Sequence, residues 1–443
     1  MGLNGIRGIS VPDQRSLPGL DKIALPKMVV LPLASRWGEA APTVQPGDKV
    51  AAGQCVAVSE DDATPPVHSS ISGTVKEISY HVVPQGRSAK CIVIESDGQD
   101  SRAAVETGGK SAPEDILRRI MAAGIREVDD HPLPLAQRLA NPDLAGKVFK
   151  RMSPSLAQPI ETLIINGMDR QPGDMVRRGI VNRSPEDLLA VVPILKELTG
   201  AGKIVFAYSQ GSAPDNSLID GMKSAGVETR EMSNKFPVAL EPILAMAVAG
   251  KEVPQPSGDT REVGIAVVDV ATALRVLDAA RDGSAGITVE VQVAAPAQGF
   301  VQQATVRTGM LLSELLEHLP PFPEKPAKAI MGGLFLGNAQ HHLDVPITAE
   351  TDSIIFQAES ELARFKNQAC TNCGYCVRYC PMRLMPNELG KFCEYGQYEA
   401  AERSFLLHCI ECGICAYVCP AQRPMVQLLR HAKLELAAMD REG

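Results

Sequence analysis

Two short segments near the end of the chain carry cysteines at the same spacing. In each segment three cysteines are separated by two residues, a fourth follows after three more, and a proline comes directly after it. The eight cysteines are Cys370, Cys373, Cys376, Cys380, Cys409, Cys412, Cys415 and Cys419. This run, C-x₂-C-x₂-C-x₃-C-P, is typical of bacterial proteins with two 4Fe–4S clusters. The spacing therefore predicts two such clusters.

The geometry of the runs predicts which thiolates share a cluster. Three closely spaced thiolates can wrap a tight turn around three irons, whereas the fourth starts the next helix and points to the neighbouring cluster. The expected sets are Cys370, Cys373, Cys376 and Cys419 for one cluster, and Cys409, Cys412, Cys415 and Cys380 for the other. Structural zinc is the alternative, but zinc sites typically use paired C-x₂-C units or include His. A ninth cysteine, Cys393, matches neither run, and we expect it to be a buried apolar side chain.

Helices are expected to position both runs. The spacer between the runs is rich in helix formers, as in the stretch 398–403. After the second run, the residues that follow an approximate helical period on a mostly apolar face are Val426, Leu429, Lys433 and Leu436. The predicted cluster module is therefore a helical ferredoxin. Two adjacent clusters without a substrate pocket of their own transport electrons.

The composition restricts what the rest of the chain can be. At roughly 100–200 residues per domain, 443 residues predict about three domains. The net charge of −8, with 44 Lys and Arg against 52 Asp and Glu, argues against nucleic-acid partners. The opening residues lack a secretory signal, and no apolar run reaches the ~18 residues that cross a bilayer. We therefore expect a soluble or peripheral protein in which clustered cysteines bind metal rather than form disulfides.

Two kinds of β structure are predicted ahead of the cysteine runs. Short alternating strands with Pro-Gly-Asp and Gly turns over 44–78 predict a small β-sandwich of the hammerhead type. From about 287 to 340, a strand–strand–helix–strand pattern predicts a β-grasp unit whose last strand covers 330–337.

Between these regions, strands alternate with helices. The predicted strands cover 161–167, 203–208 and 263–268, and a capped helix is expected to begin at Ser184. Such alternation predicts a parallel, Rossmann-like sheet. No G-x-G-x-x-G follows any of these strands, so a standard dinucleotide fingerprint is absent.

The order of the modules resembles the RnfC family, which supplies one subunit of the Rnf complex, a membrane ion-translocating ferredoxin:NAD oxidoreductase. Its most specific signatures here are the two cysteine runs, Ile330–Gly333 and Cys419–Pro424. The resemblance implies an α/β multidomain chain whose modules are a hammerhead β-sandwich over 1–110, a Rossmann-like α/β domain over 111–285, a β-grasp (SLBB-type) domain over 286–350 and a helical ferredoxin domain over 351–443. It also implies two kinds of partner: membrane subunits of an Rnf-type complex, and a redox protein as electron donor or acceptor. The implied location is peripheral, at the cytoplasmic face of the cell membrane.

The resemblance implies an FMN and NAD(H) site that this sequence has altered. In the family, the flavin phosphate lies in a glycine-rich loop, which corresponds here to residues 124–139. Three of its glycines are replaced by Glu127, Asp129 and Asp130. At an effective dielectric near 20, one carboxylate–phosphate pair at about 4 Å costs about 4 kcal/mol. A second family stretch corresponds to 166–172, where Arg170 replaces a cysteine and Gln171 an acidic residue.

We therefore expect an electron-transfer subunit that keeps the family's architecture and clusters, but whose FMN and NAD(H) chemistry these substitutions put in question. Two alternatives are open. The chain could be an FMN-containing, NADH-oxidising or NAD-reducing subunit of the same or a related complex. It could also be a non-catalytic ligand-binding module braced by its clusters.

Overall fold

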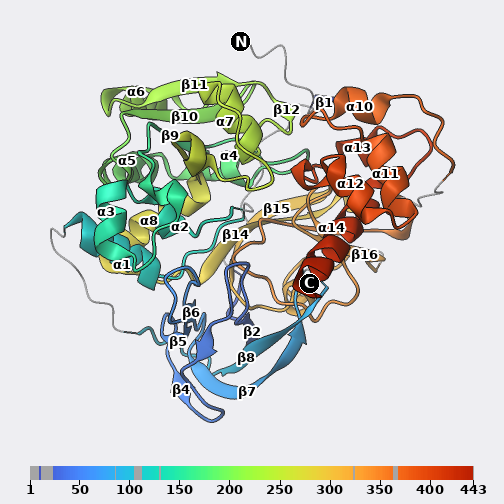
Figure 1. The fold of residues 1–443 in the computed structure, drawn as a ribbon. Helices are drawn as coiled ribbons and strands as arrows, with labels where there is room; N and C mark the ends of the chain where they lie inside the picture. Colours follow the sequence, from blue (N-terminus) through green and yellow to red (C-terminus); the bar gives the residue numbers. More distant parts are fainter. Residues whose placement is uncertain are drawn as a thin grey trace.

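The computed structural model describes residues 9–10, 23–84, 86–103, 112–128, 131–322, 325–362 and 368–442. Four regions follow one another along the chain (Figure 1). A blue β domain lies at the bottom of the view, a green α/β region at the upper left, a gold mixed sheet in the centre and an orange-to-red helical module at the upper right. The mixed α/β class that the sequence predicted is confirmed.

The N-terminal region consists of two antiparallel sheets around a common core. The sheet orders are β2-β8-β7-β4 and β3-β5-β6. The strands are β2 (Met28–Pro32), β3 (Ala41–Pro42), β4 (Lys49–Val50), β5 (Cys55–Val58), β6 (Val67–His68), β7 (Gly73–Val82) and β8 (Ser88–Ser96). Alternate positions of the strands, such as Val29 and Leu31 or Ile92 and Ile94, fill the core because successive side chains of a strand point to opposite faces. The predicted small β-sandwich is confirmed.

A four-stranded parallel sheet forms the centre of the next region. Its order is β11-β10-β9-β13. The strands are β9 (Thr162–Asn166), β10 (Lys203–Ser209), β11 (Glu228–Met232) and β13 (Ile265–Asp269). All three pairs are parallel. Every residue of β9 and of β13 is buried, as expected for a sheet covered on both faces.

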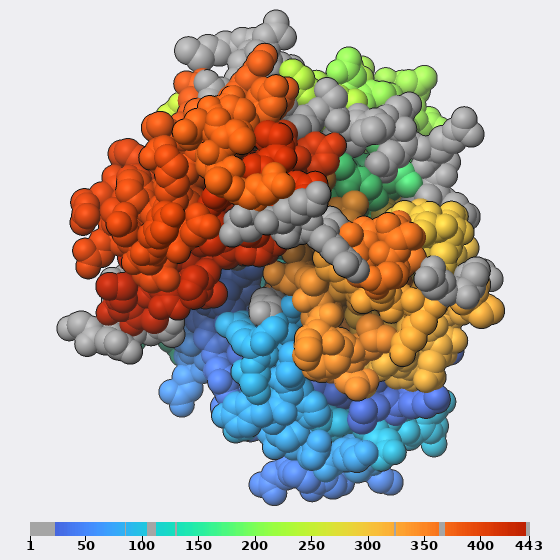
Figure 2. All heavy atoms as spheres, turned by 90° about the vertical axis from the view of Figure 1, so that its right-hand side faces the viewer, coloured from blue at the N-terminus to red at the C-terminus, as the bar shows by residue number. Residues whose placement is uncertain are grey.

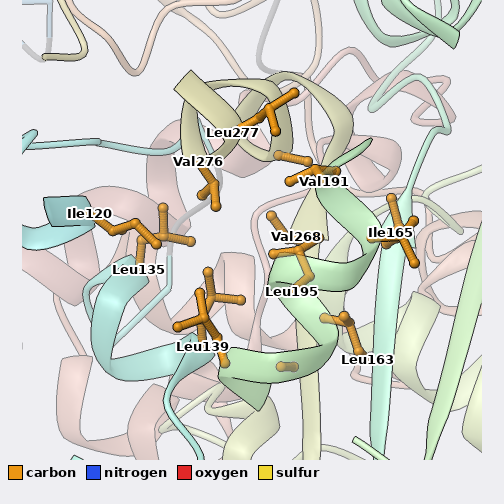
Figure 3. Close-up of a cluster of buried hydrophobic side chains, with 14 of the residues drawn as sticks. Ile120, Leu135, Leu139, Leu163, Ile165, Val191, Leu195, Val268, Val276 and Leu277 are labelled. Carbon is orange, nitrogen blue, oxygen red and sulfur yellow. The ribbon is translucent and has the colours of Figure 1, made fainter. Parts of the chain in front are cut away.

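Helices cover both faces of this sheet. They are α1 (Pro113–Ala122), α2 (Leu135–Leu139), α3 (Pro142–Val148), α4 (Val176–Arg183), α5 (Pro185–Thr199), α6 (Asn216–Ser224), α7 (Glu241–Ala249) and α8 (Val270–Asp282). Figure 3 shows Leu163 and Ile165 of β9 facing Val191 and Leu195 of α5. The intervening Ile164 instead faces a second cluster that contains residues of α7. The helix predicted to begin at Ser184 is α5, which starts one residue later.

The third region is a five-stranded mixed sheet with the order β15-β14-β18-β16-β17. Its elements are β14 (Thr288–Ala295), β15 (Phe300–Arg307), α9 (Leu312–Glu317), β16 (Lys328–Met331), β17 (Asn338–Gln340) and β18 (Ser353–Gln357). The neighbouring strands β14 and β18 are parallel, and the other pairs are antiparallel. The strand predicted over 330–337 is wrong beyond residue 331, because Gly332 and Gly333 have φ values of +90° and +87° and turn the chain. The sheet also includes β18, which lies beyond the predicted module end at 350.

The last region is helical. Its elements are α10 (Tyr375–Tyr379), α11 (Pro386–Glu394), α12 (Tyr398–Arg403), a 3₁₀ turn η6 (Leu406–His408), α13 (Ile414–Tyr417) and α14 (Met425–Glu442). Leu389, Leu406 and Leu429 from three of these elements share a core. The predicted helical ferredoxin architecture is confirmed, and the module forms the upper left flank of the face shown in Figure 2.

Contacts distant in sequence join the regions. Strand β1 (Ile9–Ser10) pairs with β12 (Lys235–Phe236), so these two residues lie against the parallel-sheet region. The Trp37 Nε1 group of the N-terminal region donates a hydrogen bond of 2.9 Å to the carbonyl of Pro132. The sole tryptophan of the chain therefore lies against the loop that precedes α2.

Candidate cluster sites and the altered crevice

One cavity of the helical module gathers cysteines from both runs. Its four thiols are those of Cys370, Cys373, Cys376 and Cys419, and its volume is about 410 Å³ including the part open to solvent. Gly374, with φ +75°, precedes α10 and lets the loop turn directly into that helix. Cys373 is exposed, so this cavity lies close to the surface of the module.

A second cavity gathers the remaining four thiols. They are Cys380, Cys409, Cys412 and Cys415, around a volume of about 460 Å³ including its open part. Most of the other lining residues are apolar, among them Leu389, Ile414 and Leu429. Cys380 and Cys412 are buried, so the thiols of this cavity are less exposed than those of the first. We call it the inner cavity, and we call the cavity of Cys370, Cys373, Cys376 and Cys419 the outer cavity.

The fourth cysteine of each run lies in the cavity of the other run. Cys380 directly follows α10, and Cys419 comes just after α13, whose N-cap Gly413 has φ +79°. Helices α10 and α13 contact each other, so the end of each helix is brought beside the opposite loop. The structure thus brings together the same two sets of four that the spacing predicts as ligands; their ligand role itself stays a prediction.

The chemistry of the cavities can be compared with that of iron–sulfur clusters. Among the described residues, no group of three or more His, Cys, Asp and Glu side chains is arranged around a single metal ion. The thiols instead surround spaces, and a 4Fe–4S cluster takes one thiolate for each iron. Burial raises the pKa of Cys412 to about 12 and that of Cys415 well above its ordinary value. As free thiols they are neutral, and coordination to a metal deprotonates such a group.

Cys393 lines neither of these two cavities. It is 4% exposed and packs in the apolar core of the helical module with Leu389 and Leu429. Burial also raises its pKa to about 11. These features agree with its expected role as a small apolar side chain.

The crevice where an α/β sheet usually binds a ligand is filled by charged side chains. Such ligands bind at the carboxyl ends of the strands, where the strand order reverses. Here β9 and β13 are those strands, and they end side by side at Asn166 and Asp269. The fully buried Arg177 occupies this edge, with its Nη1 3.1 Å from Asp352 Oδ2 and its Nε 4.0 Å from Asp269 Oδ1.

The carboxylates around Arg177 respond to burial in different ways. Burial opposes ionisation of Asp269, but Arg177 and Arg275 outweigh it and lower the pKa of that carboxyl. Burial, with a contribution from Asp352, raises the pKa of Asp174 to about 7. Among the described residues, this edge is therefore a dense set of paired charges around Arg177.

The loop that corresponds to the family's flavin-phosphate loop is closed by an ion pair. Glu127, 3% exposed, accepts a hydrogen bond from Arg138 Nη2, and Arg138 Nη1 donates at 2.8 Å to Glu241 Oε1 of α7. Arg138 itself is 0% exposed. The other two replaced glycines, Asp129 and Asp130, lie outside the described residues. At Glu127, at least, the substituted side chain occupies the interior of the loop.

His131 lies beside this ion pair. Its Nδ1 accepts a hydrogen bond from the Leu133 amide at 3.0 Å, and its ring is 1% exposed. Burial, and then the nearby Arg138, lower its pKa well below the ordinary value. His131 is therefore neutral in the folded protein near pH 7.

The second altered stretch also fills a space. Gln171 Nε2 donates at 2.7 Å to the carbonyl of Gly332, and its Oε1 accepts from the amides of Phe335 and Leu336 at 2.9 and 3.2 Å. A Cβ on Gly333 would lie 2.0 Å from Gln171 Nε2, so the two segments are in direct contact. Arg170 pairs with Asp352 at 3.3 Å.

Sequence reasoning missed the arginines that hold these regions together. Arg138 pairs with a residue 103 positions away, and Arg177 with one 175 positions away. The only signal was local: each arginine stands on a short helix with several buried apolar residues. No helix among the described residues is long and apolar enough to cross a membrane.

Comparisons with known proteins agree with this arrangement. Residues 5–99 match the model of the RnfC barrel sandwich hybrid domain, and residues 369–423 match that of a 4Fe-4S dicluster domain.

Relatives match over almost all of the chain. The C subunit of a proton-translocating ferredoxin:NAD(+) oxidoreductase complex from Clostridium ljungdahlii is 29% identical, with 94% of this chain and 90% of the relative covered. The C subunit of an ion-translocating oxidoreductase complex from Serratia proteamaculans is also 29% identical, over 99% of this chain but only 62% of the relative. A NAD+-reducing NiFe hydrogenase chain of known structure is 13% identical, with a TM-score of 0.46, and the match covers 72% of this chain and 63% of that one. Over almost all of its length the chain is similar to the C subunits of ion-translocating oxidoreductase complexes, as the order of its modules predicted.

Proposed function

We propose that this chain is a peripheral electron-transfer subunit of an Rnf-type membrane ion-translocating oxidoreductase. In this proposal it lies at the cytoplasmic face of the membrane and passes electrons between a redox protein and membrane subunits. The observation that carries the proposal is the pair of neighbouring cavities, each surrounded by three thiols of one run and the fourth of the other.

Two 4Fe–4S clusters are assigned to these cavities, with Cys370, Cys373, Cys376 and Cys419 as one ligand set and Cys409, Cys412, Cys415 and Cys380 as the other. When bound, such clusters supply one-electron transfer. The chain's own contribution is to hold the thiols, to surround the inner cavity with apolar side chains that exclude water, and to leave Cys373 near the surface. One cavity with an exposed cysteine and one with buried cysteines suit an electron path that leads from the interior of the module to a partner protein.

We also propose that the two central regions are a Rossmann-like domain and a β-grasp domain of the SLBB type. The parallel sheet with helices on both faces supports the first assignment. The second is supported by the parallel neighbouring strands β14 and β18, flanked by antiparallel strands and one helix, α9. The proposed β-grasp boundary moves from 350 to include β18. The hammerhead module stays assigned to 1–110, and the ferredoxin module, expected over 351–443, is assigned to the residues that follow β18.

We infer further that FMN and NAD(H) do not bind in the manner of the family. Three observations support this inference: the Glu127–Arg138–Glu241 ion pairs inside the loop, the Arg177 network at the ends of β9 and β13, and Gln171 in contact with the 332–336 turn. A flavin phosphate near Glu127 would meet a buried carboxylate. The names of the relatives, which include ferredoxin:NAD(+) oxidoreductase, make an NAD-linked subunit the second candidate.

The test uses the full chain, purified without air and reconstituted with iron, sulfide and FMN. We expect about eight irons and eight acid-labile sulfides for each chain, which is the content of two 4Fe–4S clusters. Electron paramagnetic resonance of the dithionite-reduced protein should show two interacting clusters. Redox-silent iron or zinc would instead support a ligand-binding module braced by metal.

The flavin and NADH arm of the same experiment is independent of the clusters. We expect substoichiometric FMN and no NADH–ferricyanide activity above the protein-free rate. Stoichiometric FMN together with NADH turnover would overturn the inference about the crevice and favour the NAD-linked subunit.

A further inference from the structure

The two cysteine loops have the same backbone conformation. At matched positions in the two runs, Asn372 and Glu411 both have φ +54°, although neither is glycine. Arg383 and Gln422, which follow the two runs at matched positions, have φ +56° and +49°. A left-handed conformation is rare for such residues, so its recurrence at equivalent places marks two copies of one loop.

The charges on the two copies differ. Asn372 of the first loop is neutral, and its side chain lies 3.6 Å from Cys370 Sγ. The matched position of the second loop carries the Glu411 carboxylate, which helix α14 holds with two cations. Lys433 Nζ lies 2.8 Å from Glu411 Oε1, and Arg430 Nε lies 2.7 Å from Glu411 Oε2. The second loop therefore has one more positive than negative charge among these three groups.

Lys433 also contacts the backbone of a predicted ligand. Its Nζ donates at 2.6 Å to the carbonyl of Cys409. The ammonium group is thus fixed beside the inner cavity, and the side chain is only 22% exposed. The long apolar stem of a lysine allows its charged end to be held in such a place.

Among the described residues that line the outer cavity, one side chain is charged. Arg423 lines that cavity and is 6% exposed, but its Nη2 donates to the carboxylate of Glu394. One cation and one anion offset each other there. The cation that α14 supplies to the inner loop has no counterpart among the described residues that line the outer cavity.

A fixed cation changes the reduction potential of a nearby cluster. Reduction adds an electron to an already negative cluster–thiolate unit, so a nearby positive charge favours the reduced state. Net charge, hydrogen bonds and solvent exposure set these potentials. The greater burial of its thiols would by itself make the inner cluster the harder of the two to reduce, and Lys433 acts against that effect.

We propose that the charge of Lys433 raises the reduction potential of the cluster held by Cys380, Cys409, Cys412 and Cys415. In this proposal the carboxylate of Glu411 has the opposite effect. This rests on the proposed function, because it requires two clusters. Arg430 fixes the arrangement further: its Nη2 donates to the Leu336 carbonyl at 3.3 Å and its Nη1 to Asn338 Oδ1 at 3.2 Å. The inner loop is in this way tied to the segment that Gln171 contacts.

The test is a potentiometric titration of the reconstituted full chain, followed by electron paramagnetic resonance. Lys433→Met should lower one of the two midpoint potentials. We expect the equilibrium constant for reduction of that cluster to fall about tenfold, which is about 59 mV for a one-electron couple. Glu411→Gln should raise the same midpoint. Lys433→Arg keeps the positive charge and should leave that midpoint at the wild-type value. The other midpoint should stay unchanged in all three variants.

The opposite signs separate charge from simple loosening of the loop, because both substitutions remove the same ion pair. The matched control is Arg403→Met, which removes an exposed cation of α12 that lines neither cavity and should shift neither midpoint. Shifts of the same sign, equal shifts of both clusters or no shift would overturn the proposal. If Lys433→Met loses iron, the midpoint of Glu411→Gln still tests the proposal, because it should rise. A wild-type chain with no reducible cluster would refute the proposed function instead.

Discussion

Replacement of Arg138 by Met should destabilise the parallel-sheet region strongly. Arg138 is fully buried between Glu127 and Glu241, which are themselves almost fully buried. Methionine has a similar length and fills much of the same space, so the change removes charge more than volume. Two carboxylates would then remain in the interior without their shared cation.

The magnitude follows from the geometry. At 2.8 Å and an effective dielectric of about 20, the attraction of Arg138 to Glu241 alone is about 6 kcal/mol before desolvation. Much of this offsets the cost of burying the charges. Breaking a buried pair by removing one partner typically costs about 3–5 kcal/mol. For a region of this size, that corresponds to a fall in melting temperature of about 6–20 °C.

Trp37 offers a local assay. Its indole donates a hydrogen bond to Pro132, and it is the sole tryptophan, so its fluorescence reports on the loop between α1 and α2. We would follow urea unfolding of Arg138→Met by this signal. The matched control is Arg118→Met, because Arg118 pairs with Asp115 on the exposed face of α1 and its loss should cost less than about 1 kcal/mol.

A rescue variant tests the stated cause. Adding Glu127→Gln to Arg138→Met should recover part of the loss, since a buried amide costs less than a buried unpaired carboxylate. A loss below about 1 kcal/mol for Arg138→Met, or a further loss on adding Glu127→Gln, would refute the view that this ion pair closes the loop.

Three further outcomes are expected. Cys419→Ala should lose the cluster of the outer cavity and the magnetic interaction between clusters, whereas Cys393→Ala should keep the wild-type iron content, measured after reconstitution. The folded-state pKa of His131 lies well below 6.5, so at acidic pH the unfolded chain binds a proton that the folded chain does not. The free energy of unfolding should therefore fall as the pH drops below about 6.5, by up to about 1.4 kcal/mol for each pH unit. His131→Asn should lessen that slope by about one proton in urea titrations at pH 5 to 7, and an unchanged slope would contradict the assignment. Gln171→Ala should cost about 1–3 kcal/mol and speed hydrogen exchange at the 335 and 336 amides; unchanged exchange there would show that Gln171 does not hold the turn.

The cysteine sets could be predicted because cluster ligation depends on short-range spacing. Within each run, a few residues fix how the chain turns around a cluster, and the exchange of the fourth cysteine follows from the same spacing. The helical period after Pro424 was also predictable, and it placed Lys433 on the face that packs inward. What this charged residue does there was not predictable, because its partner Glu411 lies 22 positions away in a loop.

The filling of the crevice could be predicted only in part. The substitutions at Glu127 and Gln171 indicated that a flavin would meet bulk and charge. The partners that neutralise these residues come from distant elements, such as α7 for Arg138 and the segment before β18 for Arg177. Similarly, the pairing of β14 with β18 joins strands separated by a helix and further strands, so the end of the sheet could not be located from local pattern.

The exchange of the fourth cysteine has a consequence for biosynthesis. In the proposed ligand sets, the first run is completed only by Cys419, the last cysteine to be made. The second run needs Cys380, which is synthesised before that run. Helix α10 places Cys380 beside the second run only after α13 has been made and packs against α10. The first run therefore cannot gain its fourth ligand until the second run has been made. A nascent chain that stops short of residue 409 should hold no complete four-thiolate cluster, rather than one of the two.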